Sequence, residues 1–261
     1  MNLNILNKKI TKNSTSQRFI EIDMLRGLAI LLMVFGHLLW DLDHFGISPI
    51  NNTLYSTLQG FVPHLFFVLV GMGIIVSKKK IENKPNIDEN LFYKRLILRG
   101  LKIFGLGMIL TIGSFIVMPD TPVYFGVLHC IGLSVILTAP FLKYRNFNVL
   151  FVFLFITGGY MISQINFQNP SLIHLTVGFH PTNVWKYTVD YFPLLPWFGF
   201  TLAGIAAGDI LYCGDKRRFR MPDISKYKPA KLFSWMGKHS LGIYLIHQPI
   251  IAGAISVFIL L

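Results

Sequence analysis

Four ionisable residues follow one face of an apolar segment near the amino terminus. Arg26 and His37 are eleven residues apart, which in an α-helix places them within about 20° of the same face and roughly 16 Å apart along the axis. Asp41 follows His37 by one helical turn, and His44 extends the same stripe. The stripe could bind an elongated anion, and its His–Asp pair could supply a general base whose tautomer the carboxylate fixes. Arg26 could instead be only a topological anchor that reaches the lipid headgroups.

Three further histidines, His64, His129 and His247, fall within apolar segments. Their positions along these segments put His64 and His129 near the level of His37, which predicts a polar pocket shared by three imidazoles. Each residue also has a structural interpretation. His64 or His129 can bond a neighbouring helix, and His247 can satisfy backbone groups that a proline two residues later sets free.

Patterns typical of metal or nucleotide sites are absent from the sequence. It contains no HExxH motif, no clustered His/Cys spacing and no glutamate pair within an apolar segment. It also lacks a Walker loop, a Rossmann fingerprint and a G-x-S-x-G elbow. We therefore expect no bound metal. The alternative is a metal site built from His37, His64 and His129.

The elements that must position these residues are membrane-spanning helices. Hydrophobic residues make up 53% of the chain and charged residues only 14%, whereas a soluble domain is about a quarter charged. About twenty apolar residues cross the roughly 30 Å hydrocarbon core. The spans predicted on this basis are 22–42, 54–77, 96–118, 123–142, 147–164, 193–213 and 237–260. The fold class is therefore an all-α polytopic membrane helix bundle of about seven transmembrane helices.

The basic residues predict the orientation of this bundle. Of the 24 Lys and Arg residues, 23 fall in four clusters that alternate with basic-free gaps between the spans, and only Lys186 departs from the pattern. Because cytoplasmic loops carry the excess of Lys and Arg, the amino terminus is inside and the carboxyl terminus outside. Residues 1–17 form a cytoplasmic basic tail and residues 18–261 a single transmembrane domain. We expect a multi-pass protein of the cytoplasmic membrane.

The same pattern limits the partners of the chain. Topology and contact with anionic lipid headgroups account for its net charge of +12, so nucleic acid is not an expected partner. Glycines within the spans allow close helix packing, either inside one subunit or in a homo-oligomer. The longest outer connection, 165–192, is of a length that usually serves as a lid or a binding surface. Its Asp190 and Tyr191, with Trp197 just beyond, offer a carboxylate and aromatic faces suited to a sugar.

Four separated motifs resemble a known family of membrane enzymes. Ile22-Asp23-Met24-Leu25-Arg26-Gly27-Leu28-Ala29-Ile30, followed by His37, resembles the opening helix of transmembrane acyltransferases. The other three motifs are Phe125-Gly126-Val127-Leu128-His129, Asp190-Tyr191-Phe192-Pro193-Leu194-Leu195-Pro196-Trp197-Phe198-Gly199, and His239-Ser240-Leu241-Gly242-Ile243-Tyr244-Leu245-Ile246-His247-Gln248-Pro249. They look like prokaryotic relatives of the heparan-alpha-glucosaminide N-acetyltransferase catalytic domain family. The resemblance implies transfer of an acyl group, such as acetyl, from cytoplasmic acyl-coenzyme A to a sugar or glycan acceptor across the membrane.

The resemblance leaves two histidines as candidates for the general base. In the lysosomal branch of the family the catalytic histidine follows the first helix and would match His44. In the bacterial O-acyltransferase branch, the intramembrane histidine matches His37. We favour His37 because Asp41 lies one turn away and Arg26 shares its face.

The remaining roles follow from the same comparison and from the expected depth of each residue. His129 or His64 could donate to the oxyanion that develops on the thioester carbonyl. The expected site residues are His37, Asp41, His44 and His129 for catalysis, Arg26, Arg99, Lys102 and His247 for acyl-coenzyme A, and His64, Asp190, Tyr191 and Trp197 for the acceptor.

A different class of function fits the intramembrane histidines as well. A small-molecule or proton-coupled transporter would place them around a substrate site or a proton relay. No inverted repeat and no pair of broken helices appears in the two halves of the chain. We therefore prefer the enzyme. A sensor is less favoured, because seven-helix receptors usually have the opposite orientation.

Overall fold

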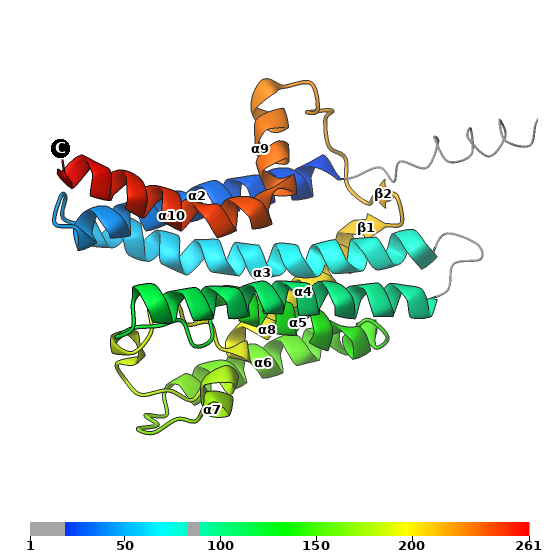
Figure 1. The fold of residues 1–261 in the computed structure, drawn as a ribbon. Coiled ribbons are helices and arrows are strands. Elements are labelled where there is room, and N and C mark those ends of the chain that lie inside the picture. Colours follow the sequence, from blue (N-terminus) through cyan, green and yellow to red (C-terminus); the bar gives the residue numbers. More distant parts are fainter. Residues whose placement is uncertain (1–18, 83–88, 261) are drawn as a thin grey trace, which may run out of the picture.

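The computed structural model describes residues 19–82 and 89–260, which are predominantly helical (Figure 1). Seven apolar helices form the bundle: α2 (Ile20–His44), α3 (Asn52–Glu82), α4 (Glu89–Val117), α5 (Val127–Phe141), α6 (Asn148–Ser163), α8 (Leu194–Leu211) and α10 (Ser240–Leu260). Five of them are long and apolar enough to cross a membrane, and α5 and α6 are shorter apolar helices. The predicted all-α polytopic membrane bundle is confirmed. The predicted tail, 1–17, lies outside the described residues.

Short elements connect these helices. They are the 3₁₀ turns η1 (Arg145–Phe147) and η2 (Val184–Lys186), the helices α7 (Leu172–Val177) and α9 (Lys228–Lys238), and the antiparallel pair of strands β1 (Tyr212–Cys213) and β2 (Lys216–Arg217). The fourth predicted span begins four residues too early. Residues 123–126 are not helical, because the backbone at Phe125 pairs with Tyr191 and accepts a hydrogen bond from the N–H of Phe192.

The helices divide into two groups that α8 joins. In Figure 1, α2, α3 and α10 lie on one side, and α4, α5 and α6 on the other, while α8 packs on both α3 and α6. Glycines bring the α3 and α8 backbones together. A Cβ at Gly71 would lie 2.8 Å from the backbone nitrogen of Ile205, and one at Gly204 would lie 2.8 Å from the carbonyl carbon of Val68. Such contacts hold helices together in lipid, where no hydrophobic force drives them to associate.

The amphipathic helix α9 runs across α2 and packs against its first part (Figure 1). Gly27 of α2 faces the backbone of Phe233, and Gly237 of α9 faces the backbone of Asp23. This crossing anchors the beginning of α2, the helix that carries the stripe of ionisable residues.

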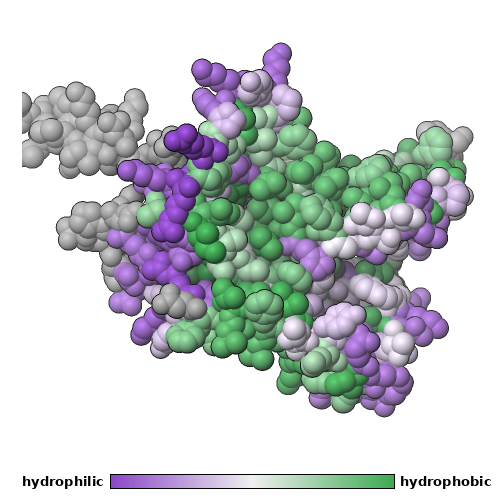
Figure 2. Space-filling model, turned by 180° about the vertical axis from the view of Figure 1, so that it is seen from behind, coloured by the Kyte–Doolittle hydropathy of each residue, from purple (hydrophilic) through white to green (hydrophobic). Residues whose placement is uncertain are grey.

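Basic residues gather at one end of the bundle, which we call the basic end. Lys79 forms an ion pair of 2.8 Å with Asp209, and Arg145 reaches the same carboxylate at 3.3 Å. Arg217 donates two hydrogen bonds, of 2.6 and 2.8 Å, to the carboxylate of Glu21. Figure 2 shows hydrophilic residues at this end and hydrophobic side chains over the middle of the molecule. The arrangement agrees with the alternation of basic clusters along the sequence.

Candidate functional site

A cavity of about 2050 Å³ lies between the two groups of helices. Residues from α2, α3, α4, α5, α8 and α10 line it, together with the end of α9 and the connection that precedes α8. On α2 alone the lining extends from Ile22 to His44. This central cavity therefore follows nearly the full length of the first membrane helix.

Cations line the central cavity toward the basic end. They include the three predicted residues Arg26, Arg99 and Lys102, and also Lys80 and Lys238. The guanidinium of Arg26 donates to the carbonyl of Leu69 at 3.2 Å and lies 3.7 Å from the carboxylate of Asp23. It occupies space that exists only because residue 73 has no side chain, since a Cβ at Gly73 would contact its Nη2 atom.

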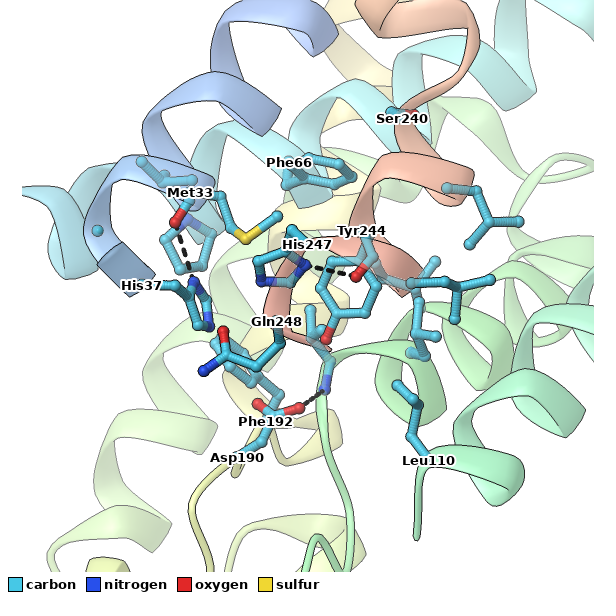
Figure 3. Close-up of a pocket in the computed structure, with 18 of the residues that line it drawn as sticks. Met33, His37, Phe66, Leu110, Asp190, Phe192, Ser240, Tyr244, His247 and Gln248 are labelled. Atoms are coloured by element: carbon cyan, nitrogen blue, oxygen red, sulfur yellow. Dashed lines mark hydrogen bonds between the residues drawn. The ribbon is translucent and has the colours of Figure 1, made fainter. Parts of the chain in front are cut away.

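His37 lines the central cavity farther along α2. Its Nδ1 lies 2.9 Å from the carbonyl oxygen of Met33, one turn earlier in the helix (Figure 3). A carbonyl only accepts hydrogen bonds, so in the neutral ring Nδ1 carries the hydrogen and Nε2 carries a lone pair. The backbone of α2 thus gives His37 the tautomer of a general base.

His247 of α10 lies beside His37. The two rings meet edge to face with their centroids 4.8 Å apart. The Nδ1 of His247 is 2.6 Å from the carbonyl oxygen of Tyr244, so this ring has the same tautomer. Its Nε2 is buried and has no hydrogen-bond partner among the described residues. His247 therefore bonds the backbone of its own helix and also lines the central cavity.

Asp41 has a partner that the sequence did not indicate. Its carboxylate accepts two hydrogen bonds, of 2.9 and 3.1 Å, from the side-chain amide of Gln248. We expected Asp41 to support the ring of His37, but the hydrogen bond that orients this ring comes from Met33. The residue is only 2% exposed, so its carboxylate is held within the bundle between α2 and α10.

His44, the alternative base, is the last residue of α2. Its ring stacks on Trp40 with centroids 4.8 Å apart and an angle of 10° between the planes. It is exposed and lines the end of the central cavity opposite the basic end. The structure thus places His37 and His44 along the same cavity, with His37 deeper.

Asp190, Tyr191 and Trp197, predicted to contact the acceptor, all line the central cavity. The carboxylate of Asp190 accepts a hydrogen bond of 3.1 Å from the N–H of Val127, at the amino terminus of α5. Burial raises the pKa of Asp190 to about 6, against the opposing effects of this bond and of the nearby His37. The hydroxyl of Tyr191 donates to the carbonyl of Leu175 at 2.9 Å, which holds the connection around α7 against the site.

His64 and His129 do not line the central cavity, so the pocket of three imidazoles predicted from their depth is not formed. His129 is only 2% exposed. Its Nδ1 accepts from the N–H of Gly126 at 3.2 Å, and its Nε2 lies 3.4 Å from the hydroxyl of Thr111. The Nδ1 contact caps the amino terminus of α5, and the Nε2 contact joins α5 to α4.

His64 is engaged in a similar way on α3. Its Nδ1 bonds the carbonyl of Gly60, and its ring contacts Trp197 and Phe200 of α8 at centroid distances of 4.8 and 4.4 Å. Depth along a helix does not say which way a side chain points, and this is why the prediction failed. For these two residues the structural interpretation describes the observed contacts.

Gln248 and Tyr244 are the residues at the site that the sequence did not single out. Both line the central cavity from α10 (Figure 3). The sequence did carry one signal for Gln248, which is a carboxamide directly after a histidine inside an apolar segment. In the part of the chain that the structure describes, no group of three or more His, Cys, Asp or Glu residues could hold a metal ion.

Comparison with known proteins identifies the family. Searches among curated proteins and among solved structures gave no significant match. The family model described as heparan-alpha-glucosaminide N-acetyltransferase, catalytic, matches residues 18–249. This match spans the basic end, the central cavity and the segments that carry His37, Asp190 and His247. The chain belongs to the heparan-alpha-glucosaminide N-acetyltransferase catalytic family.

Proposed function

We propose that the protein transfers an acyl group, acetyl in the simplest case, from cytoplasmic acyl-coenzyme A to an acceptor on the other side of the cytoplasmic membrane. The observation that carries the proposal is that a single cavity joins the cations of the basic end to His37. Membership of an acetyltransferase family supports the same reaction. The acceptor is a sugar amine or hydroxyl, for which Asp190 and the aromatic rings of Tyr191 and Trp197 provide a suitable surface.

The donor would lie along α2. Its phosphates would be held by Arg26, Arg99 and Lys102, because charge-assisted hydrogen bonds to phosphate oxygens are stronger than hydrogen bonds between neutral groups. Arg26 and His37 are separated by roughly 16 Å of helix, a distance that an extended pantetheine arm can bridge. The thioester then reaches His37 while the anionic part of coenzyme A stays at the basic end.

His37 would act first as base and then as acid. Its Nε2 takes the proton of the acceptor hydroxyl or amine as the acceptor oxygen or nitrogen attacks the thioester carbonyl. The carbonyl re-forms, the carbon–sulfur bond breaks, and the thiolate of coenzyme A takes the proton from the imidazolium. The products are the acylated acceptor and free coenzyme A, and the ring returns to its neutral form.

The test measures binding and turnover separately on detergent-purified protein. Calorimetry with acetyl-coenzyme A gives the affinity, and release of free thiol gives the rate, with and without glucosamine. We expect Arg26→Ala to weaken binding and His37→Ala to stop turnover while binding is kept. Arg95→Ala is the matched control, since Arg95 is an exposed cation of α4 that does not line the central cavity. Folded wild-type protein that does not bind acetyl-coenzyme A would overturn the proposal.

A further inference from the structure

Gln248 can present only one of its two polar atoms to Asp41. A carboxylate accepts hydrogen bonds and does not donate them, so the amide nitrogen must face Asp41, as the two bonds of 2.9 and 3.1 Å show. The carboxamide oxygen, Oε1, is then fixed on the other side. This oxygen is buried and has no hydrogen-bond partner among the described residues.

The neighbouring residue on α10 presents a second acceptor. His247 is 8% exposed, and its Nδ1–H is used on the carbonyl of Tyr244, which leaves the lone pair on Nε2. Like the Gln248 oxygen, this nitrogen is buried and unpaired in the described part of the chain. Figure 3 shows both side chains directed toward His37 in the same pocket.

Two buried acceptors without donors are costly for a protein to maintain. A buried polar atom without a partner has lost its hydrogen bonds to water and gained none in return, and a bound ligand that donates hydrogen bonds removes this cost. The ligand must supply hydrogens, because a second acceptor would repel these atoms. The thioester carbonyl and sulfur offer only lone pairs, so the reacting end of the donor does not meet this requirement.

We propose that His247 and Gln248 are positioning residues that hold a hydrogen-bond-donor group of the acyl acceptor beside His37, and that Asp41 acts through Gln248 by fixing its carboxamide. The inference rests on the proposed acyltransferase function. The reacting hydrogen goes to Nε2 of His37. A second N–H of an amine, or a neighbouring hydroxyl of a sugar, donates to the His247 nitrogen and the Gln248 oxygen.

The test uses hydroxylamine as a small acceptor that carries both N–H and O–H donors. The Michaelis constants for hydroxylamine and for acetyl-coenzyme A are measured on the purified protein, after subtraction of the uncatalysed reaction. The variants are His247→Leu, Gln248→Met, Asp41→Leu and the double variant of Asp41 and Gln248. His247→Gln is the conservative variant, because a glutamine oxygen can accept near the position of Nε2. Ile246→Ala, on the exposed face of the same helix, is the matched control.

We expect His247→Leu and Gln248→Met each to raise the KM for hydroxylamine roughly three- to tenfold, as the loss of one hydrogen bond predicts. The KM for acetyl-coenzyme A should stay within twofold, and His247→Gln should recover most of the loss. Asp41→Leu should resemble Gln248→Met, and the double variant should be no worse than Gln248→Met alone, because both remove the same oriented oxygen.

Three results would overturn this inference while leaving the proposed function in place. One is an unchanged KM for hydroxylamine in His247→Leu and Gln248→Met. Another is a rise confined to the KM for acetyl-coenzyme A, which would assign the two acceptors to the pantetheine amides. The third is a loss of turnover in every variant with neither KM changed, which would assign these residues a purely structural role. Wild-type protein without acetyl-coenzyme A binding would overturn the proposed function, and the inference with it.

Discussion

The rings of His37 and His247 meet edge to face at 4.8 Å, and each ring uses its Nδ1 on a carbonyl of its own helix. Two helices from opposite ends of the chain therefore deliver the same tautomer to one place. His37 is the more exposed of the two, so its ring is the more accessible from the central cavity, which both residues line.

Replacing His37 with alanine should remove the general base. We expect the rate of acetyl transfer to fall by about 10²- to 10⁴-fold, the usual contribution of a positioned base. Thermal unfolding should be little changed, because the hydrogen bond of this side chain goes to an adjacent turn of its own helix. His44→Ala is the comparison, and it should keep most of the activity. The reverse pattern, with activity lost only in His44→Ala, would move the base to the end of α2.

The guanidinium of Arg26 can be displaced by a substitution that leaves its charge in place. A Cβ at residue 73 would contact Nη2 of Arg26, so Gly73→Ala should displace the guanidinium from its place in the central cavity. We expect the Kd for acetyl-coenzyme A to rise about three- to tenfold, as for a weakened charge-assisted hydrogen bond. Stability should hardly change, since the far end of a flexible side chain can move aside. Gly60→Ala, which meets open space on the same helix, should leave the Kd unaltered, and equal affinities for the two variants would contradict the prediction.

The helical framework could be predicted because lipid imposes it. A segment that crosses the hydrocarbon core must be a long apolar helix or part of a closed barrel, and the seven predicted spans match seven helices. The alignment of Arg26 and His37 along one cavity could also be predicted, since it depends only on the period within a single helix. The beginning of α5 was predicted four residues too early, because backbone pairing of Phe125 with Tyr191 replaces a helical turn there.

Contacts between helices could not be predicted in the same way. Asp41 and Gln248 are 207 residues apart, and nothing local to either residue indicates that they meet. His64 and His129 were assigned to the pocket from their depth, but the rotation of each helix turns their rings toward neighbouring helices. His247 was assigned to the cofactor on resemblance, and its contact with His37 emerged only from the packing of α10 against α2.

The crossing of α2 and α9 should depend on the absence of a side chain at residue 27. A Cβ at Gly27 would lie 2.7 Å from the carbonyl carbon of Phe233 and closer still to its oxygen, and these are backbone atoms that cannot move independently. We expect Gly27→Ala to destabilise the protein by about 1–3 kcal/mol, the usual cost of overpacking. The measurement is the apparent Tm in detergent. Gly105→Ala, in open space on α4, should leave the Tm unchanged or raise it slightly, because alanine favours the helix. Equal shifts in the two variants would show that α9 does not depend on this contact.

The carboxyl group of Asp190 should make stability depend on pH. Burial raises its pKa in the folded protein to about 6 from the ordinary value of 3.8. Between these two values the folded state therefore binds more protons than the unfolded state. By linkage, this stabilising contribution is complete below pH 3.8 and is lost as the pH rises toward about 6. Because Asp190 is only partly buried, we expect the free energy of unfolding to fall by about 1–2 kcal/mol as the pH rises through this range.

Asp190→Asn isolates this effect, because an asparagine oxygen can still accept the bond from the N–H of Val127 but does not titrate. The apparent Tm of both proteins is measured from about pH 4 to about pH 7.5, a range that brackets the folded pKa of about 6. The difference, wild type minus variant, should decrease with rising pH and level off above the folded pKa of about 6. A difference that stays constant across this range, or one that grows with pH, would show that Asp190 is already ionised at the lower limit and is stabilised as a carboxylate at the start of α5.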